Sequence, residues 1–243
     1  MAEPRTTTDF IWTCLPGLHG TDALFRKFCA ALQSAFPEEQ ECECINLPTK
    51  GNQDYHTLSK WLNDELPNRN DKKRIILAES FSGPLAMMFA SQRPDEVAGI
   101  IQASSFCDAP LNPGIALLPL RPLFMVKPHR KALEHFLVGK DASDEEITEL
   151  TKVIQAIPSA TLTRRLRAIL ELEEGDSPKL NGTPMLLLQA QDDNLVPWEA
   201  QQRLEAHYPD ARVHWIPSPH MILQRHPETC LKKIMDFTAS LSN

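Results

Sequence analysis

Short apolar runs that alternate with helical stretches constrain the fold of this chain more than any other feature. Most of the runs have the length of a strand, and most are followed by a segment with helical spacing. This alternation predicts a parallel sheet of an α/β protein, because parallel strands need crossover connections. We expect six parallel strands near residues 9–16, 41–47, 73–79, 98–104, 184–190 and 211–216. We expect core helices near residues 21–35, 55–66, 82–92, 198–207 and 227–240.

Ser80 stands at the end of one apolar run, where the strand leads directly into a tight turn that opens a helix. A strained turn that lifts a hydroxyl above a sheet needs small residues two before and two after the serine. Ala78 and Ser82 fill these positions. Both replace glycines of the G-x-S-x-G pattern, so the segment also fits an ordinary serine that caps a helix. The choice between nucleophile and cap depends on partners elsewhere in the chain.

Such partners follow downstream. A serine nucleophile needs a histidine base and an acid that fixes the tautomer of that histidine, and here the expected order is Ser, Asp, His. The loop after the strand at 184–190 offers Asp192 and Asp193, and His220 lies in the loop before the last helix. Open α/β sheets place their sites at the carboxyl ends of the strands, so we expect these loops to meet Ser80.

With these residues the chain resembles the α/β-hydrolase superfamily over nearly its whole length. The resemblance is to the small bacterial carboxylesterase-like branch that includes the pimeloyl-carrier-protein methyl ester esterases. In that family the acid lies four residues before the proline of an Asp-x-x-Val-Pro segment, which here implies Asp193 rather than Asp192. The histidine lies seven residues before a proline that starts the final helix, which implies His220. The resemblance implies an α/β-hydrolase sheet. The full sheet of that family begins with two further strands, but only about eight residues precede the first strand here, so we expect a sheet without the N-terminal hairpin.

The resemblance also implies two backbone donors for an oxyanion hole. One is the N–H of Phe81, directly after the nucleophile. The other comes from the loop after the first strand, where family members usually read His-Gly-x. Residues 16–17 occupy the His-Gly position here, so the implied donor is the N–H of Leu18. We interpret His19, in the literal His-Gly that follows, as a residue at the pocket rim and a candidate substrate contact.

Residues 110–175 predict an inserted helical cap, with the α/β-hydrolase core at 1–109 and 176–243. The first part of the insertion is rich in proline and apolar residues, so we expect a semi-rigid wall over the pocket, with Met125 as a candidate substrate contact. Three helices follow. The clearest starts at a capping box of Ser143 and Glu146.

The third cap helix, near residues 160–173, carries the basic group Arg164, Arg165 and Arg167. We expect Arg164 and Arg167 on its outward side and Arg165 on its flank. The chain resembles esterases that accept acyl groups from an acidic carrier protein. These three arginines are therefore candidate contacts for such a carrier. The competing interpretation is a solvated face, since Glu171 can pair with Arg167.

Composition and cysteine usage exclude several other classes. A net charge of −7 argues against a nucleic-acid surface, and no apolar run reaches the length that spans a bilayer. The N-terminal segment lacks an apolar signal core, so we expect a cytoplasmic protein with reduced thiols in its core. Cys42 and Cys44 share one face of a strand, but we expect no paired Cys or His set near them and therefore no metal site.

These features predict a serine hydrolase that cleaves a carboxylic ester or thioester through an acyl-enzyme on Ser80, without cofactor or metal. The expected substrate is a small-molecule ester, free or carried on an acyl carrier protein. The same scaffold also supports acyl transfer and carbon–carbon hydrolysis or lyase chemistry. A non-catalytic small-molecule receptor with this fold is the alternative from a different class.

Overall fold

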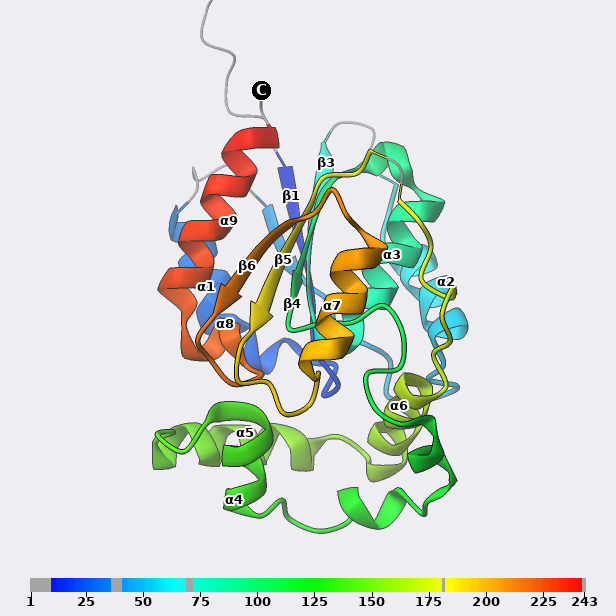
Figure 1. Ribbon diagram of the computed structural model, residues 1–243, viewed down its shortest axis with the longest axis vertical. Helices are drawn as coiled ribbons and strands as arrows, with labels where there is room; N and C mark the ends of the chain where they lie inside the picture. The colour runs from blue at the N-terminus through cyan, green and yellow to red at the C-terminus, as the bar shows by residue number, and fades with distance from the viewer. Residues whose placement is uncertain (1–9, 36–40, 69–71, 181, 242–243) are drawn as a thin grey trace, which may run out of the picture.

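The computed structural model describes residues 10–35, 41–68, 72–180 and 182–241 (Figure 1). These residues form a six-stranded sheet in the order β2-β1-β3-β4-β5-β6, with every neighbouring pair parallel. The strands are β1 (Phe10–Leu15), β2 (Glu41–Cys44), β3 (Lys73–Glu79), β4 (Val97–Ala103), β5 (Met185–Ala190) and β6 (Arg212–Ile216). The prediction of six parallel strands is confirmed.

Helices cover both faces of this sheet. The helices of the described residues are α1 (Arg26–Ala35), α2 (Tyr55–Glu65), α3 (Gly83–Gln92), α4 (Arg130–Leu133), α5 (Asp144–Ala156), α6 (Ser159–Leu170), α7 (Trp198–His207), α8 (Ile222–Arg225) and α9 (Pro227–Leu241). In Figure 1, α1, α8 and α9 lie on one face and α2, α3 and α7 on the other. In the described part of the chain, no helix is both long and apolar enough to cross a bilayer.

Two hydrophobic cores lie on the two faces of the sheet. Successive strand residues point to opposite faces, so Ile76 of β3 joins one core and Leu77 joins the other. Ile76 packs with residues such as Phe89 of α3, whereas Leu77 packs with residues such as Ile234 of α9. Because helices bury both faces, β3 and β5 are apolar without alternation, as their sequences indicated.

The second strand is shorter than we expected from the sequence. We expected a strand over 41–47, but β2 ends at Cys44. Beyond it, the Ile45 N–H still donates to the Cys14 carbonyl and the Leu47 N–H to the Gly20 carbonyl, both at 2.9 Å. The chain therefore continues along the loop after β1, where no regular strand is available as a partner. This contact anchors that loop beside the edge of the sheet.

Residues 110–175, here named the cap segment, lie beyond the carboxyl ends of the strands (Figure 1). They contain α4, a π-helical turn over Glu134–Val138, α5 and α6. The predicted capping box is present, since the Ser143 hydroxyl accepts from the Glu146 N–H and the Glu146 carboxylate accepts from the Ser143 N–H. A small apolar cluster that includes Leu150 and Met221 joins this segment to the loop after β6.

Candidate active site

Ser80 stands in a strained turn at the carboxyl end of β3. Its φ is 49°, in the left-handed region that a residue with a Cβ rarely adopts. A 3₁₀ turn over Ser80–Ser82 leads at once into α3. The Ser105 hydroxyl donates to the Ser80 carbonyl at 2.8 Å, and a Cβ at Gly83 would lie 1.8 Å from that same hydroxyl oxygen. The close approach therefore requires a glycine at position 83, one residue after the position of the second glycine in the G-x-S-x-G pattern.

Ser80, His220 and Asp193 form a continuous chain of hydrogen bonds. The Ser80 Oγ lies 2.9 Å from His220 Nε2, and His220 Nδ1 lies 2.7 Å from Asp193 Oδ2. The three side chains come from the segments after β3, β6 and β5, which the parallel sheet brings to one edge. With Nδ1–H donating to the carboxylate, Nε2 keeps a lone pair that can accept the serine proton.

The Asp193 carboxylate is completely buried and fully hydrogen-bonded. Its Oδ1 accepts from the N–H groups of Leu195 and Val196, at 2.8 and 2.9 Å, while its Oδ2 faces His220. Asp192 is exposed. The structure thus places Asp193, the residue that the resemblance implied, against the imidazole.

Two carboxylates set the basicity of His220. Burial disfavours the imidazolium, but the charge and hydrogen bond of Asp193, together with the charge of Glu79, outweigh it and raise the pKa of His220 above its ordinary value. Glu79 is itself buried and accepts from Gln224 Nε2 at 3.0 Å. Burial raises the pKa of Glu79, but His19 and Gln224 outweigh this effect and hold it below its usual range. Sequence reasoning did not anticipate this influence of Glu79 on His220.

The loop after β1 is fixed through three consecutive carbonyl groups. Those of residues 16–18 accept from the Ser82 hydroxyl, the Gly20 N–H and the Arg165 guanidinium, respectively. The peptide that carries the Leu18 N–H lies inside this stretch, so its direction is fixed by bonds on both sides. Ser82, which replaces a glycine of the usual pattern, therefore contributes a hydroxyl that ties the turn at Ser80 to this loop.

The second implied donor, the N–H of Phe81, lies in the 3₁₀ turn after Ser80. The first N–H groups of a helix have no acceptor within it, so this group is available to a substrate oxygen. The Phe81 carbonyl accepts from the Tyr55 hydroxyl at 3.0 Å, and the two rings stack with centroids 5.0 Å apart. Both implied donors are thus held by side chains that bond the neighbouring backbone.

Arg165 does not lie on the surface. Its side chain is fully buried, and its guanidinium donates to Gln53 Oε1 and to the carbonyls of Leu18 and Pro48 at 2.9 to 3.1 Å. It also lies 5.9 Å from the centre of the Phe81 ring. The expectation that Arg165 contacts a carrier protein is therefore wrong, because α6 packs this side chain against loops of the core.

Arg164 and Arg167 are exposed on α6, as helical spacing predicted. Arg164 donates to the Gly51 carbonyl at 2.9 Å, which leaves its charge at the surface. The basic group on this helix thus consists of two exposed guanidinium groups and one buried one.

His19 and Met125, the two candidate substrate contacts, have different environments. His19 is buried, its Nδ1 accepts from the Thr21 N–H at 3.2 Å, and its Nε2 lies 3.9 Å from the Glu79 carboxylate. It therefore lies against Glu79 rather than open at a rim. Met125 is 65% exposed on the cap segment.

The cap segment is hydrogen-bonded to both loops that hold the histidine and the acid. Asn194 Nδ2, next to Asp193, donates to the His135 carbonyl at 2.9 Å. The Met221 N–H, next to His220, donates to the Leu137 carbonyl at 3.0 Å. Both acceptors lie in the π-helical turn Glu134–Val138.

With the cap segment in this position, Ser80 is 9% exposed and His220 is 5% exposed. Two clefts, of about 650 and 530 Å³, lie elsewhere, one beside α7 and β6 and one between α2, α3 and α6. Neither is lined by the three hydrogen-bonded residues.

A separate cluster of cysteines corrects the expectation for Cys42 and Cys44. Their sulfur atoms lie within 4.8 Å of those of Cys14 and Cys29. The expectation that no paired cysteine stands nearby is wrong, because β1 and α1 bring residues distant in sequence to the face that Cys42 and Cys44 share.

Residues 50–224 match the model of a protein family described as serine aminopeptidase, S33. The matched segment contains Ser80, Asp193 and His220. A search of curated proteins gave no significant match to the sequence.

Three solved structures show how widely this fold is shared. A carboxylesterase structure from the thaumarchaeon Nitrososphaera gargenis has a TM-score of 0.80 at 15% identity, covering 96% of this chain and 91% of that one. An esterase from Exiguobacterium antarcticum has a TM-score of 0.77 at 13% identity, covering 96% and 93%. The enol-lactonase from Burkholderia xenovorans has a TM-score of 0.80 at 12% identity, covering 97% and 94%. At these identities the likeness establishes the fold.

Proposed function

This chain belongs to the serine aminopeptidase S33 family of α/β-hydrolases, and from that premise we propose that it is a serine hydrolase that cleaves a carboxylic ester or thioester. The observation that carries the proposal is the chain of hydrogen bonds from Ser80 Oγ through His220 to Asp193. A hydroxyl is a weak nucleophile at its ordinary pKa, and a neutral imidazole held in one tautomer by a carboxylate is the means of activating it.

In the first half of the reaction, the Ser80 Oγ attacks the acyl carbon while His220 Nε2 takes its proton. The imidazolium that results is stabilised by the buried Asp193 carboxylate, which remains ionised. His220 then gives the proton to the leaving alcohol or thiol, and the acyl group stays on Ser80. The raised pKa of His220 favours this transient imidazolium.

Negative charge develops on the substrate carbonyl oxygen during the attack. We assign its stabilisation to the backbone N–H groups of Leu18 and Phe81, which are supported by the bonds of Arg165 and Tyr55 to the adjacent carbonyls. Preorganised donors of this kind contribute about 3 kcal/mol each to lowering a barrier. In the second half of the reaction, water attacks the acyl-enzyme with His220 as base, and Ser80 is restored.

The cap segment is proposed as the lid that selects the acyl group. Its hydrogen bonds to the loops at Asn194 and Met221 couple closure of the lid to the position of Asp193 and His220. A closed, water-poor site strengthens the electrostatic interactions that catalysis uses. The substrate class proposed is a small-molecule ester, like those implied by the names of the esterase and lactonase structures, handled in the cytoplasm.

The test is covalent labelling with a fluorophosphonate, with the modified residue identified by peptide mass spectrometry. We expect the wild type to be labelled at Ser80 and the Ser80→Ala variant not at all. His220→Ala should label at least about a thousandfold more slowly, since the two residues act as one unit. Ser91→Ala, at an exposed serine of α3, is the matched control and should label like the wild type.

A series of p-nitrophenyl esters of graded chain length then separates an enzyme from the alternative, a receptor with the same fold. Turnover that depends on Ser80 and has an optimum in chain length supports the proposal. A folded wild type that neither labels nor cleaves any ester of the series would contradict it.

A further inference from the structure

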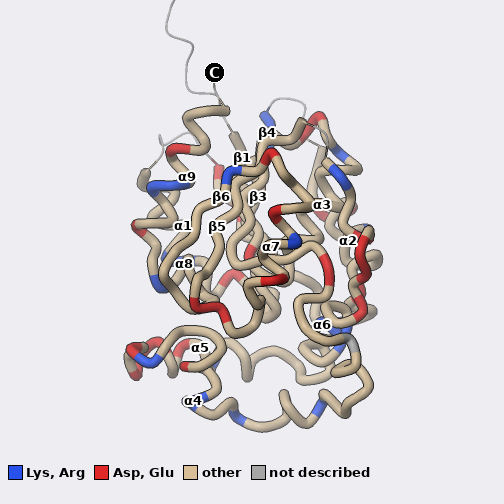
Figure 2. Tube along the Cα trace, in the orientation of Figure 1, with Lys and Arg blue, Asp and Glu red and all other residues tan. Residues whose placement is uncertain are grey.

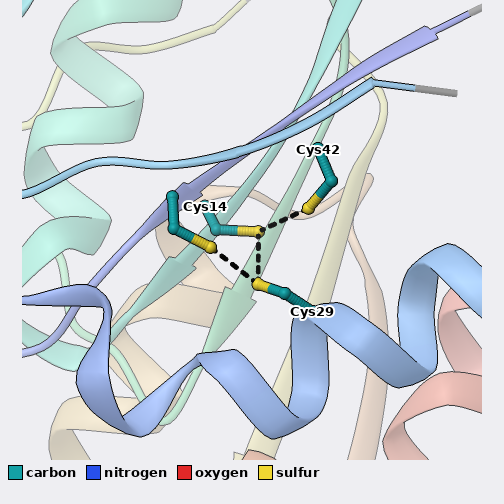
Figure 3. A group of neighbouring side chains, drawn as sticks. Cys14, Cys29 and Cys42 are labelled. Carbon is teal, nitrogen blue, oxygen red and sulfur yellow. Dashed lines mark hydrogen bonds between the residues drawn. The ribbon is translucent and has the colours of Figure 1, made fainter.

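Four cysteines gather on the face of the sheet that α1 covers. Cys14 lies on β1, Cys29 on α1, and Cys42 and Cys44 on β2 (Figure 3). The Cys14 Sγ lies 3.7 Å from that of Cys29 and 4.0 Å from that of Cys42, and the Cys29 Sγ lies 2.8 Å from that of Cys44. All four sulfur atoms lie within 4.8 Å of one another.

The topology explains why these residues meet. Cys42 and Cys44 are two apart on a strand, so their side chains point to the same face. In the parallel register, Cys44 lies beside Cys14 of β1. Cys29 belongs to the buried face of α1, which packs onto this face of the sheet within the same core. Three separate elements thus direct their thiols to one point.

The spacing of the sulfur atoms fits one tetrahedrally coordinated ion. Zn²⁺ bound by thiolates has Zn–S distances of about 2.3 Å, which places the sulfur atoms of a tetrahedron about 3.8 Å apart. The separations of Cys14 from Cys29 and from Cys42 agree with that value. Cys29 and Cys44 must move apart by about 1 Å, and the remaining pairs lie within 4.8 Å of each other, so small side-chain rotations can bring the four sulfur atoms to tetrahedral spacing.

We propose that Cys14, Cys29, Cys42 and Cys44 form a binding site for Zn²⁺. The donor set is four sulfur atoms, the set typical of closed structural zinc sites, and soft thiolate ligands select Zn²⁺ over hard cations such as Mg²⁺ or Ca²⁺. Cys14 and Cys29 are buried, whereas Cys42 and Cys44 are half-buried at the edge of the sheet. The ion can therefore reach the site from the β2 side.

The position of the site indicates a structural role for the ion. An ion there would link β1, the short edge strand β2 and α1, and it would be anchored one residue before Leu15, where the loop that carries Leu18 begins. Because an ion bound to the folded form alone stabilises it by mass action, zinc should raise the unfolding temperature. The proposed hydrolysis does not use the ion, so the two proposals can fail separately.

The experiment starts from protein reduced and freed of metal by a chelator under anaerobic conditions. Zn²⁺ is titrated against a chromogenic chelator, and Co²⁺ is then used as a spectroscopic probe. We expect one Zn²⁺ per chain, a higher unfolding temperature, and the intense visible bands and thiolate charge-transfer absorption of tetrahedral Co²⁺. Cleavage of a p-nitrophenyl ester well below the unfolding temperature should change less than about twofold on zinc removal.

Variants decide which thiols bind the ion. Cys42→Ser and Cys44→Ser, at half-buried positions, should each weaken zinc binding at least about a hundredfold. Cys107→Ser is the matched control, because Cys107 is buried and lies outside the cluster. No tetrahedral Co²⁺ spectrum in the wild type, or equal zinc binding in all three variants, overturns the proposal. So does a Cys29–Cys44 disulfide that re-forms in a buffer of excess reduced glutathione with a small fraction of oxidised glutathione as the oxidant, and that prevents zinc uptake.

Discussion

Asp192 and Asp193 are adjacent in the sequence but occupy opposite environments. Asp193 is buried, with both carboxylate oxygens engaged, whereas Asp192 is exposed. The choice between them could not be made from the residues alone, because either could follow a strand in that loop. The family resemblance implied Asp193, and the hydrogen bond to His220 agrees with it.

Asp193→Asn should lower kcat for ester cleavage by about 10³-fold or more, because an amide no longer stabilises the imidazolium and allows the wrong tautomer. Asp192→Asn should change kcat less than about twofold. The measurement is steady-state cleavage of a p-nitrophenyl ester, with unfolding temperatures as the check on folding. Greater damage from the Asp192 change at an unaltered unfolding temperature would contradict the assignment.

The second residue-scale prediction concerns Glu79 and pH. His220 must be neutral to act as base, so kcat/KM should rise with pH through the pKa of His220 in the free enzyme. Because that pKa is raised, the rise should lie above the ordinary histidine value of about 6.5. Glu79→Gln removes a negative charge that stabilises the imidazolium, so the pKa falls and the rise should move to lower pH.

The pH dependence of kcat/KM for wild type and Glu79→Gln measures this shift. The glutamine can still accept from Gln224, which keeps the packing behind Ser80. Glu96→Gln, directly before β4, removes one charge elsewhere and should leave the profile in place. A profile that stays fixed or moves to higher pH in Glu79→Gln would show that Glu79 does not act on His220.

At the scale of elements, the strands and core helices were predictable because their apolar patterns are local. The contacts that fix the loop at Leu18 were not, since the Ser82 and Arg165 bonds join segments far apart in sequence. A signal for Arg165 did exist. It lies three residues after Leu162 and four before Ile169, so the three share the buried face of α6. The four-cysteine cluster was missed for the same reason, because only tertiary packing brings Cys14 and Cys29 to β2.

Arg165 should act as a positioning residue for the oxyanion hole. Arg165→Lys keeps the charge but loses the forked geometry that bonds the Leu18 carbonyl together with Gln53 and Pro48. A misplaced Leu18 N–H weakens the transition state more than the ground state, so kcat should fall about tenfold or more while KM changes little.

Steady-state kinetics with a p-nitrophenyl ester, beside the unfolding temperature, separate this role from a purely structural one. Arg167→Lys, at an exposed position of the same helix, is the control and should match the wild type. A lower unfolding temperature with unchanged kcat in the folded fraction would assign Arg165 to stability alone.

For the molecule as a whole, the net negative charge opposes binding of an acidic acyl carrier protein. The net charge is −7, and acidic residues gather along α2 and in the region of α5 (Figure 2). An acidic acyl carrier would be repelled by most of this surface, so docking would depend on a local basic patch. Arg164 and Arg167 on α6 are exposed and belong to the cap segment, so they are the local basic group that such docking would use.

If a carrier docks there, the double change Arg164→Glu and Arg167→Glu should lower kcat/KM for a carrier-linked ester at least about tenfold at low salt. Cleavage of a small p-nitrophenyl ester should stay within about twofold, because the patch governs encounter rather than chemistry. Since exposed charges are screened over about 10 Å at 0.1 M salt, added salt should remove most of the difference. Lys232→Glu with Lys233→Glu on α9 changes the net charge equally and is the matched control. Equal losses in both double variants would assign the effect to net charge, and no loss in either would leave a free small ester as the substrate.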